Sequence, residues 1–244
     1  MNPGEELRSG ASTSTHAFIL GSFPFGETDK IVHLLTRDAG YVHGLARRAA
    51  RSQKRFGASL ETFSHVVAHL KVPRDFERNA DKLWTLESCE LRDPFLHLRK
   101  SYELMDSAFF VVQVLLEILP LRDPSLSPFV MLGRLLRDSE MLSNSPRSAW
   151  IRPFVLSWVG EAAGFGNIFE PLEQNFFGRL PRQVLDTWHH AVRAKEPNLK
   201  PLFQTLLVPQ APDWKMENDR ELYESWVNHT GMTLKFFEQR SRKA

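Results

Sequence analysis

The sequence predicts an α+β protein of two domains, a small β-barrel followed by an all-α helical domain. Up to about residue 92 the chain has short apolar segments, several of which alternate with polar residues, separated by Gly or Pro. After Asp93-Pro94 apolar residues recur every three or four positions instead. We therefore expect a flexible tail over residues 1–15, the barrel over 16–92 and the helical domain over 93–244.

The barrel prediction depends on the number and spacing of the strand-like segments. These segments are residues 18–20, 31–36, 41–46, 62–72 and 83–91. Strands this short and closely spaced, and too few for a sandwich, favour a closed or partly closed barrel.

The helical prediction depends on apolar periodicity. The first helix is expected from Leu98, Tyr102, Met105, Phe109, Val112, Leu116 and Leu119. Further helical patterns cover residues 127–142, 148–163, 181–194 and 219–240. Connections that contain Pro or Gly separate them, as expected between helices.

One segment has an unusual charge. The 244 residues carry a formal net charge of only +2, yet Tyr41–Leu60 contains five cations and no acidic side chain. The five are Arg47, Arg48, Arg51, Lys54 and Arg55. An acid-free cluster on a loop between strands indicates an anionic partner, with phosphate the first candidate. The alternative is a solvated loop whose charges keep a sheet edge soluble.

We extend the predicted DNA-binding set to four further residues of the barrel. They are Arg37, Phe56, Lys71 and Arg74. Phe56 directly follows Lys54 and Arg55, so its ring is a candidate for stacking on a base. Ordinary packing in the core is the alternative for this ring.

A second candidate site lies in the helical domain. Arg152, Phe154 and Trp158 place a cation beside aromatic rings at a predicted helix start. Such a group can form a pocket for an acidic peptide with a hydrophobic end. The alternative is ordinary packing, with Arg152 extending to solvent.

Several classes of protein are disfavoured. Cys89 is the only cysteine, which excludes a disulfide or a cysteine-based zinc site within one chain. No phosphate-binding glycine loop, nucleophile elbow or HExxH helix occurs, so we expect neither an enzyme nor a cofactor. The longest apolar run is too short for a membrane span, and the first fifteen residues are polar. We therefore expect a cytoplasmic protein without a membrane partner.

Four segments, in order, resemble the bacterial RecO family of recombination and repair proteins. They are GETDKIVHLLTRDAG (26–40), LARRAARSQKRF (45–56), LETFSHVVAHL (60–70) and RPFVLSWVGEAAGFG (152–166). The resemblance implies an N-terminal OB-fold and a helical domain. Arg48 replaces a glycine of the family's basic loop. NIFEPLEQNFFGRLP (167–181) lacks the cysteines of the zinc motif that many members carry.

The resemblance also implies a function. It indicates a nucleoid-associated recombination mediator that binds single- and double-stranded DNA, anneals complementary strands and acts with RecR to help load RecA filaments. Arg152 approximately matches a basic residue of the family's pocket for the C-terminal tail of single-strand binding protein. The competing hypothesis is a protein-interaction module that binds acidic peptide tails and has incidental DNA affinity.

Overall fold

The structure is a computed structural model that describes residues 9–75, 82–166, 180–194, 198–208, 211–214 and 216–236. The chain divides into two compact units. The first contains residues up to Phe95 together with Leu119–Gly133, and the second contains Leu96–Ile118 and the residues from Arg134 onward.

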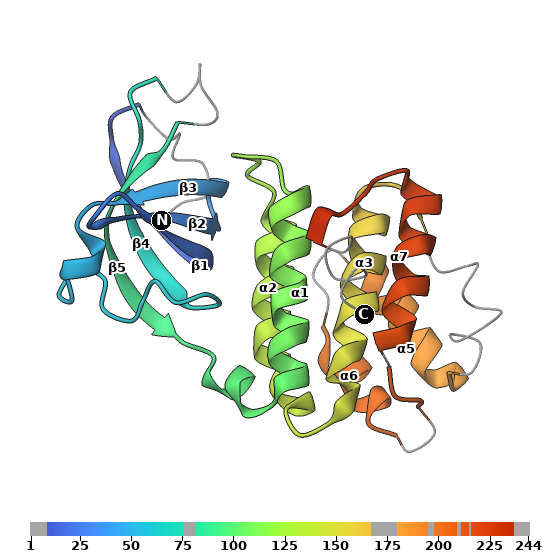
Figure 1. The fold of residues 1–244 in the computed structure, drawn as a ribbon. Helices are drawn as coiled ribbons and strands as arrows, with labels where there is room; N and C mark the ends of the chain where they lie inside the picture. Colours follow the sequence, from blue (N-terminus) through green and yellow to red (C-terminus); the bar gives the residue numbers. More distant parts are fainter. Residues whose placement is uncertain are drawn as a thin grey trace. The chain divides into compact units, whose positions relative to one another are not determined.

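Five strands of the first unit close into a barrel (Figure 1). They are β1 (Ser12–Phe25), β2 (Asp29–Thr36), β3 (Gly40–Ala46), β4 (His65–Lys71) and β5 (Trp84–Asp93). The order around the barrel is β1-β2-β3-β5-β4. Neighbouring strands are antiparallel except β3 and β5, which pair in parallel at Gly44↔Trp84 and Leu45↔Thr85.

Alternating side chains explain why these segments form strands. In β4, Val66, Ala68 and Leu70 are buried, whereas His65 and His69 are partly exposed. Because successive residues of a strand point to opposite faces, this pattern places one row of apolar side chains in the barrel core. The core packs the corresponding rows of all five strands together.

The turn between β2 and β3 requires its particular residues. The Thr36 hydroxyl donates to the Gly40 carbonyl (2.8 Å) and accepts from the Ala39 N–H (3.0 Å). Gly40 has φ +67°, and a Cβ built there would lie 1.8 Å from the Asp123 carbonyl oxygen. Only glycine fits this backbone conformation and close approach.

The connection after the first helix packs on the barrel. The Arg122 N–H donates to the Tyr41 carbonyl (2.8 Å), and the rings of Phe18 and Phe129 lie 4.9 Å apart. Residues 119–133 therefore group with the barrel, although the periodicity of the sequence assigns them to the helical domain.

The second unit consists of helices (Figure 1). The N-terminal part of α2, up to Gly133, belongs to the first unit instead. They are α1 (Tyr102–Ile118), α2 (Leu126–Asp138), α3 (Ile151–Ala162), α5 (Arg182–Arg193), α6 (Lys200–Leu206) and α7 (Met216–Thr230). Short 3-10 helices are Ala49–Arg51 (η1), Leu96–Lys100 (η2), Ser139–Leu142 (η3) and Pro146–Trp150 (η4). The buried face of α1 includes Leu104, Ala108, Val111 and Leu115, at helical spacing.

The strand segments and five helices agree with the predictions, but two boundaries differ and one helix was not predicted. β1 begins at Ser12, so residues 12–15 belong to the barrel and not to a tail. The pattern over 219–240 is interrupted because Gly231, with φ +68°, ends α7 through an N–H bond to the Val227 carbonyl (2.8 Å). The sequence did not predict α6, a short helix of seven residues.

Among the residues that the structure describes, no helix is both long and apolar enough to cross a membrane.

We predict that Gly40→Ala destabilises the barrel more than Gly26→Ala does. Both glycines have positive φ, +67° and +64°, for which an alanine costs about 1–2 kcal/mol. Only Gly40 adds a clash, because a Cβ at Gly26 meets nothing within 4 Å. Urea unfolding of both variants measures the difference, and equal losses of stability would contradict the close packing at Asp123.

Candidate nucleic-acid interface

The basic segment forms a loop that leaves β3 and is fixed to the turn before β2. Arg48 has a left-handed backbone conformation, with φ 54°. Its N–H donates to the Asp29 carboxylate (2.8 Å), and the Ala50 N–H donates to the Thr28 carbonyl (3.0 Å). The GETD turn (residues 26–29) and the basic segment, which are separated in sequence, therefore contact each other.

Arg55 and Phe56 close the loop at its other end. The Arg55 guanidinium donates to the Arg47 carbonyl (2.7 Å) and to the Ser52 hydroxyl (3.0 Å), and lies 5.0 Å from the centre of the Phe56 ring. The Cys89 N–H of β5 donates to the Arg55 carbonyl (3.0 Å). The loop is thus bound to the barrel at both ends.

Phe56 is not available for stacking on a base in this conformation. Its side chain is only 3% exposed and belongs to the barrel core. Core packing was the alternative for this residue, and the structure supports it. Phe56 fixes the loop, and other rings must provide any stacking.

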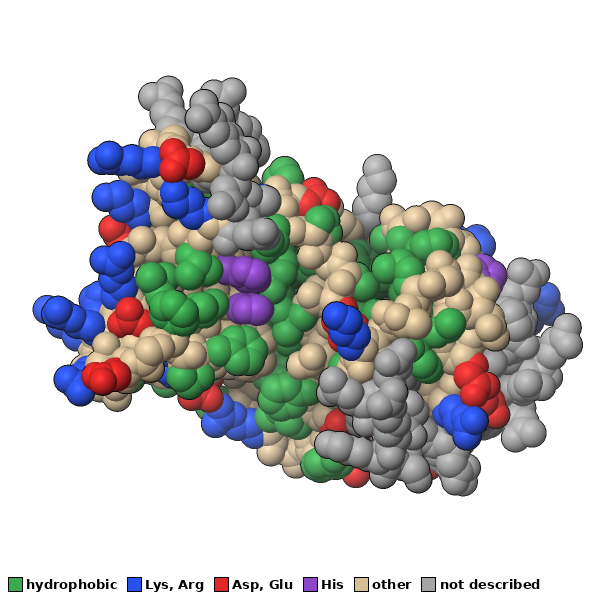
Figure 2. Space-filling view, turned by 45° about the horizontal axis from the view of Figure 1, so that its top comes forward, with side chains coloured by type: hydrophobic (Ala, Val, Ile, Leu, Met, Phe, Trp, Pro, Cys, Tyr) green, Lys and Arg blue, Asp and Glu red, His purple; other side chains and the backbone are tan. Residues whose placement is uncertain are grey.

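Four of the five cations face solvent. Arg47, Arg48, Arg51 and Lys54 are exposed, and none forms an ion pair with another residue in the described part of the chain. Figure 2 shows Lys and Arg side chains along the outer edge of the barrel. Because the guanidinium of Arg55 is used within the loop, the site offers four charges that an anion can neutralise.

Strand register places Lys71 at the same end of the barrel as this loop. Thr85 of β5 pairs with Lys71 on one side and with Leu45 on the other, two residues before Arg47. Lys71 and Arg74 are both exposed. Lys71 is the last residue of β4, and Arg74 lies in the connection that leads to β5.

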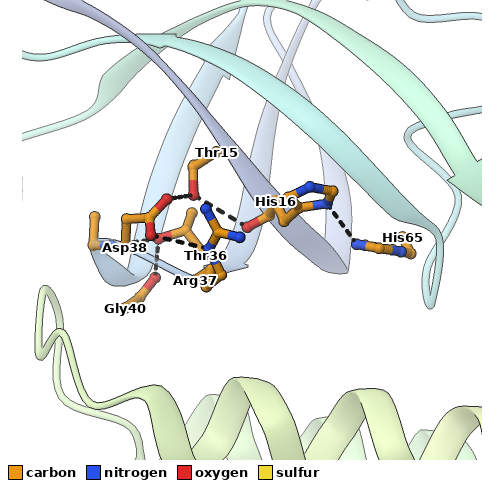
Figure 3. Close-up of polar contacts among 8 residues, drawn as sticks. Thr15, His16, Thr36, Arg37, Asp38, Gly40 and His65 are labelled. Carbon is orange, nitrogen blue, oxygen red and sulfur yellow. Dashed lines mark hydrogen bonds and ion pairs between the residues drawn. The ribbon is translucent and has the colours of Figure 1, made fainter. Parts of the chain in front are cut away.

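Arg37 lies apart from the basic loop, in the turn between β2 and β3. Its Nε donates to the Asp38 carboxylate (3.1 Å), which also accepts from the Thr15 hydroxyl (2.6 Å; Figure 3). Burial opposes ionisation of Asp38, but these hydrogen bonds hold its pKa below the ordinary value. The charge of Arg37 is therefore largely compensated within the turn.

Exposed aromatic rings lie on β1, where the sequence analysis did not place them. Phe23 and Phe25 are 48% and 50% exposed. The sequence contains one indication, because the two rings alternate in FPF directly before the GETD turn. The Phe23 ring contacts His33, whose pKa is lowered to about 4 by burial and by His43. His33 in turn contacts Tyr41, whose pKa is raised to about 12 by burial.

The predicted peptide pocket is not present at Arg152. The side chains of Arg152, Phe154 and Trp158 are at most 4% exposed. Arg152 forms ion pairs with Asp106 of α1 and, at 2.5 Å, with Asp219 of α7. These residues form the core that joins three helices, because a buried guanidinium needs carboxylate partners.

The Trp214 indole N–H extends this buried ion-pair cluster by donating to Asp219 (2.8 Å). A hollow in the described part of the helical unit lies between α3 and α5 and is lined by Glu161, Trp188 and Arg193, among others. Arg152 does not line it.

Within the described ranges, no group of three or more His, Cys, Asp or Glu side chains is placed to hold a metal ion. The segment that replaces the family's zinc motif falls mainly on residues 167–179, which lie outside the described residues.

The chain is similar to one protein family and to several known proteins. Residues 11–95 match the family described as Recombination protein O N terminal. The DNA repair protein RecO of Syntrophobacter fumaroxidans is 36% identical over 127 residues, which are 52% of this chain and 48% of that protein. RecO of Koribacter versatilis is 28% identical over 156 residues, or 62% and 58% of the two chains.

The barrel segment is thus of the RecO N-terminal type, and the resemblance to RecO indicated by the motifs is confirmed. The chain spans about half the length of the curated relatives it matches.

We predict that Arg152→Ala lowers the free energy of unfolding of the helical unit by about 3–5 kcal/mol, because it leaves the buried Asp219 and the partly buried Asp106 without their ion-pair partner. Urea unfolding followed by tryptophan fluorescence measures the loss. Arg220→Ala is the matched control, since it removes an exposed ion pair with Glu224 (3.0 Å) and should cost less than about 1 kcal/mol. Equal effects would contradict the structural role of Arg152.

Proposed function

We propose that this protein is a recombination mediator in DNA repair that binds single- and double-stranded DNA through an OB-fold barrel. In this proposal it anneals complementary strands and acts without catalysing a reaction. The relatives named DNA repair protein RecO support the biological role. The basic loop supports the mode of binding.

One observation carries the DNA-binding proposal. Four exposed cations without acidic partners among the described residues project from a loop whose backbone is fixed at both ends. Arg and Lys bind phosphate oxygens, and phosphate contacts carry no sequence information. The loop therefore suits a nucleic-acid backbone of any sequence, as strand annealing requires.

The proposed partners follow from the resemblance to RecO. We propose that RecR and the C-terminal tail of single-strand binding protein bind this protein, and that together they help to load RecA in the cytoplasm, at the nucleoid. Because Arg152 is part of the helical core, the acidic tail must be recognised elsewhere.

An acidic-peptide module remains the second candidate, because the same four cations suit carboxylates as well as phosphates. A peptide that ends in Asp-Asp-Asp-Ile-Pro-Phe tests it. If this peptide binds the basic loop more tightly than an oligonucleotide does, the second candidate is favoured.

We predict that replacing Arg47, Arg48, Arg51 and Lys54 by Ala reduces the salt dependence of binding to single-stranded DNA. Loss of four phosphate contacts should lower the slope of log affinity against log salt by about 2.8, equivalent to about fiftyfold between 50 and 200 mM salt. Titration of a fluorescent oligonucleotide at several salt concentrations measures this slope.

Two controls separate charge from fold. Replacing the three arginines of this set by Lys keeps the charges and should keep the slope. Arg37→Ala should change affinity little, because Asp38 already compensates that charge. An unchanged slope in the fourfold alanine variant would reject the loop as the DNA-binding site.

A further inference from the structure

Two large rings are exposed side by side on the outside of the barrel. Phe23 and Phe25 stand two residues apart on β1, so they point to the same face of the strand. Both are about half exposed. Clustered apolar exposure of this kind is typical of an interaction site.

The neighbouring strands continue this surface. Phe23 pairs in register with Ile31 of β2, which pairs with Leu45 of β3. The Phe23 ring contacts His33 edge-on (5.1 Å between centroids), and His33 stacks on His43 (4.3 Å). We call the surface formed by Phe23, Phe25, Ile31, His33, His43 and Leu45 the aromatic face.

The rings of the aromatic face are held in position. The Tyr41 hydroxyl is hydrogen-bonded to His33 Nδ1 (2.7 Å) and to His43 Nε2 (2.9 Å). The Phe23 ring lies over Gly21, where a Cβ would come within 2.9 Å of it. Because burial and the neighbouring His43 lower its pKa to about 4, His33 is neutral near pH 7. Rings that are already held in place lose little entropy on stacking.

The aromatic face borders the basic loop. Phe25 pairs in register with Asp29, whose carboxylate holds Arg48. Leu45 lies near the end of β3, two residues before Arg47, which follows the strand. On the barrel, Figure 2 shows hydrophobic side chains gathered beside two histidines, with Lys and Arg along the edge.

We propose that the aromatic face stacks unpaired bases of a single strand whose phosphates lie along the basic loop. Rings beside cations are the combination that binds single strands, since rings stack on bases and cations contact the backbone. Paired bases in a duplex are already stacked, so the aromatic face should select single strands over duplexes. This inference rests on the proposed function and adds strand selectivity to it.

The test compares Phe23→Leu/Phe25→Leu with the wild-type protein on three probes of equal length. The probes are a single-stranded thymidine oligonucleotide, the same backbone with abasic sites, and a duplex. We expect the variant to bind the normal single strand about tenfold more weakly, with an unchanged salt slope. Its affinity for the abasic strand and the duplex should equal that of the wild type.

Tyr102→Leu is the matched control, because it removes an exposed ring (80%) from α1 of the other unit. Equal binding of the normal strand by wild type and variant would overturn the proposal, as would equal binding of normal and abasic strands by the wild type. The second comparison needs no substitution, so it holds even if the variant is unstable. Failure of the wild type to bind any probe would instead reject the proposed function itself.

Discussion

The hydrogen bond from the Arg48 N–H to the Asp29 carboxylate (2.8 Å) is the interaction on which the placement of the basic loop depends. Arg48 has a left-handed conformation that a non-glycine residue adopts only at a cost. A charged acceptor gives one of the stronger hydrogen bonds available to a backbone amide and offsets that cost. Asp29 therefore positions the backbone of the loop without using the side chains of Arg47, Arg48, Arg51 and Lys54.

The barrel makes this arrangement possible because it closes β3 onto β5 over only two residue pairs. Beyond them the loop runs beside β5, bonded through the Arg55 carbonyl to Cys89 and buried at Phe56. The loop thus contributes Phe56 to the barrel core and exposes its cations to solvent. One segment serves both stability and recognition.

The sequence alone predicted those features that depend on a local pattern of residues. Period-two alternation located the strands, three- and four-residue spacing located five helices, and the absence of acids identified the basic loop. The sequence did not predict the role of residues whose environment depends on tertiary contacts. Phe56 and Arg152 resemble binding residues in sequence, yet one fills the barrel core and the other pairs with carboxylates 46 and 67 residues away.

Comparison of Asp29→Asn with Asp29→Ala tests most directly whether the anchored loop presents the cations. Both variants remove the same negative charge, but only Asn keeps an oxygen that can accept from Arg48. We predict that Asp29→Ala binds single-stranded DNA several-fold more weakly than Asp29→Asn, although their net charges are equal. Equal affinities, or tighter binding by both variants to the same extent, would show that charge alone matters and that the anchored loop does not present the cations.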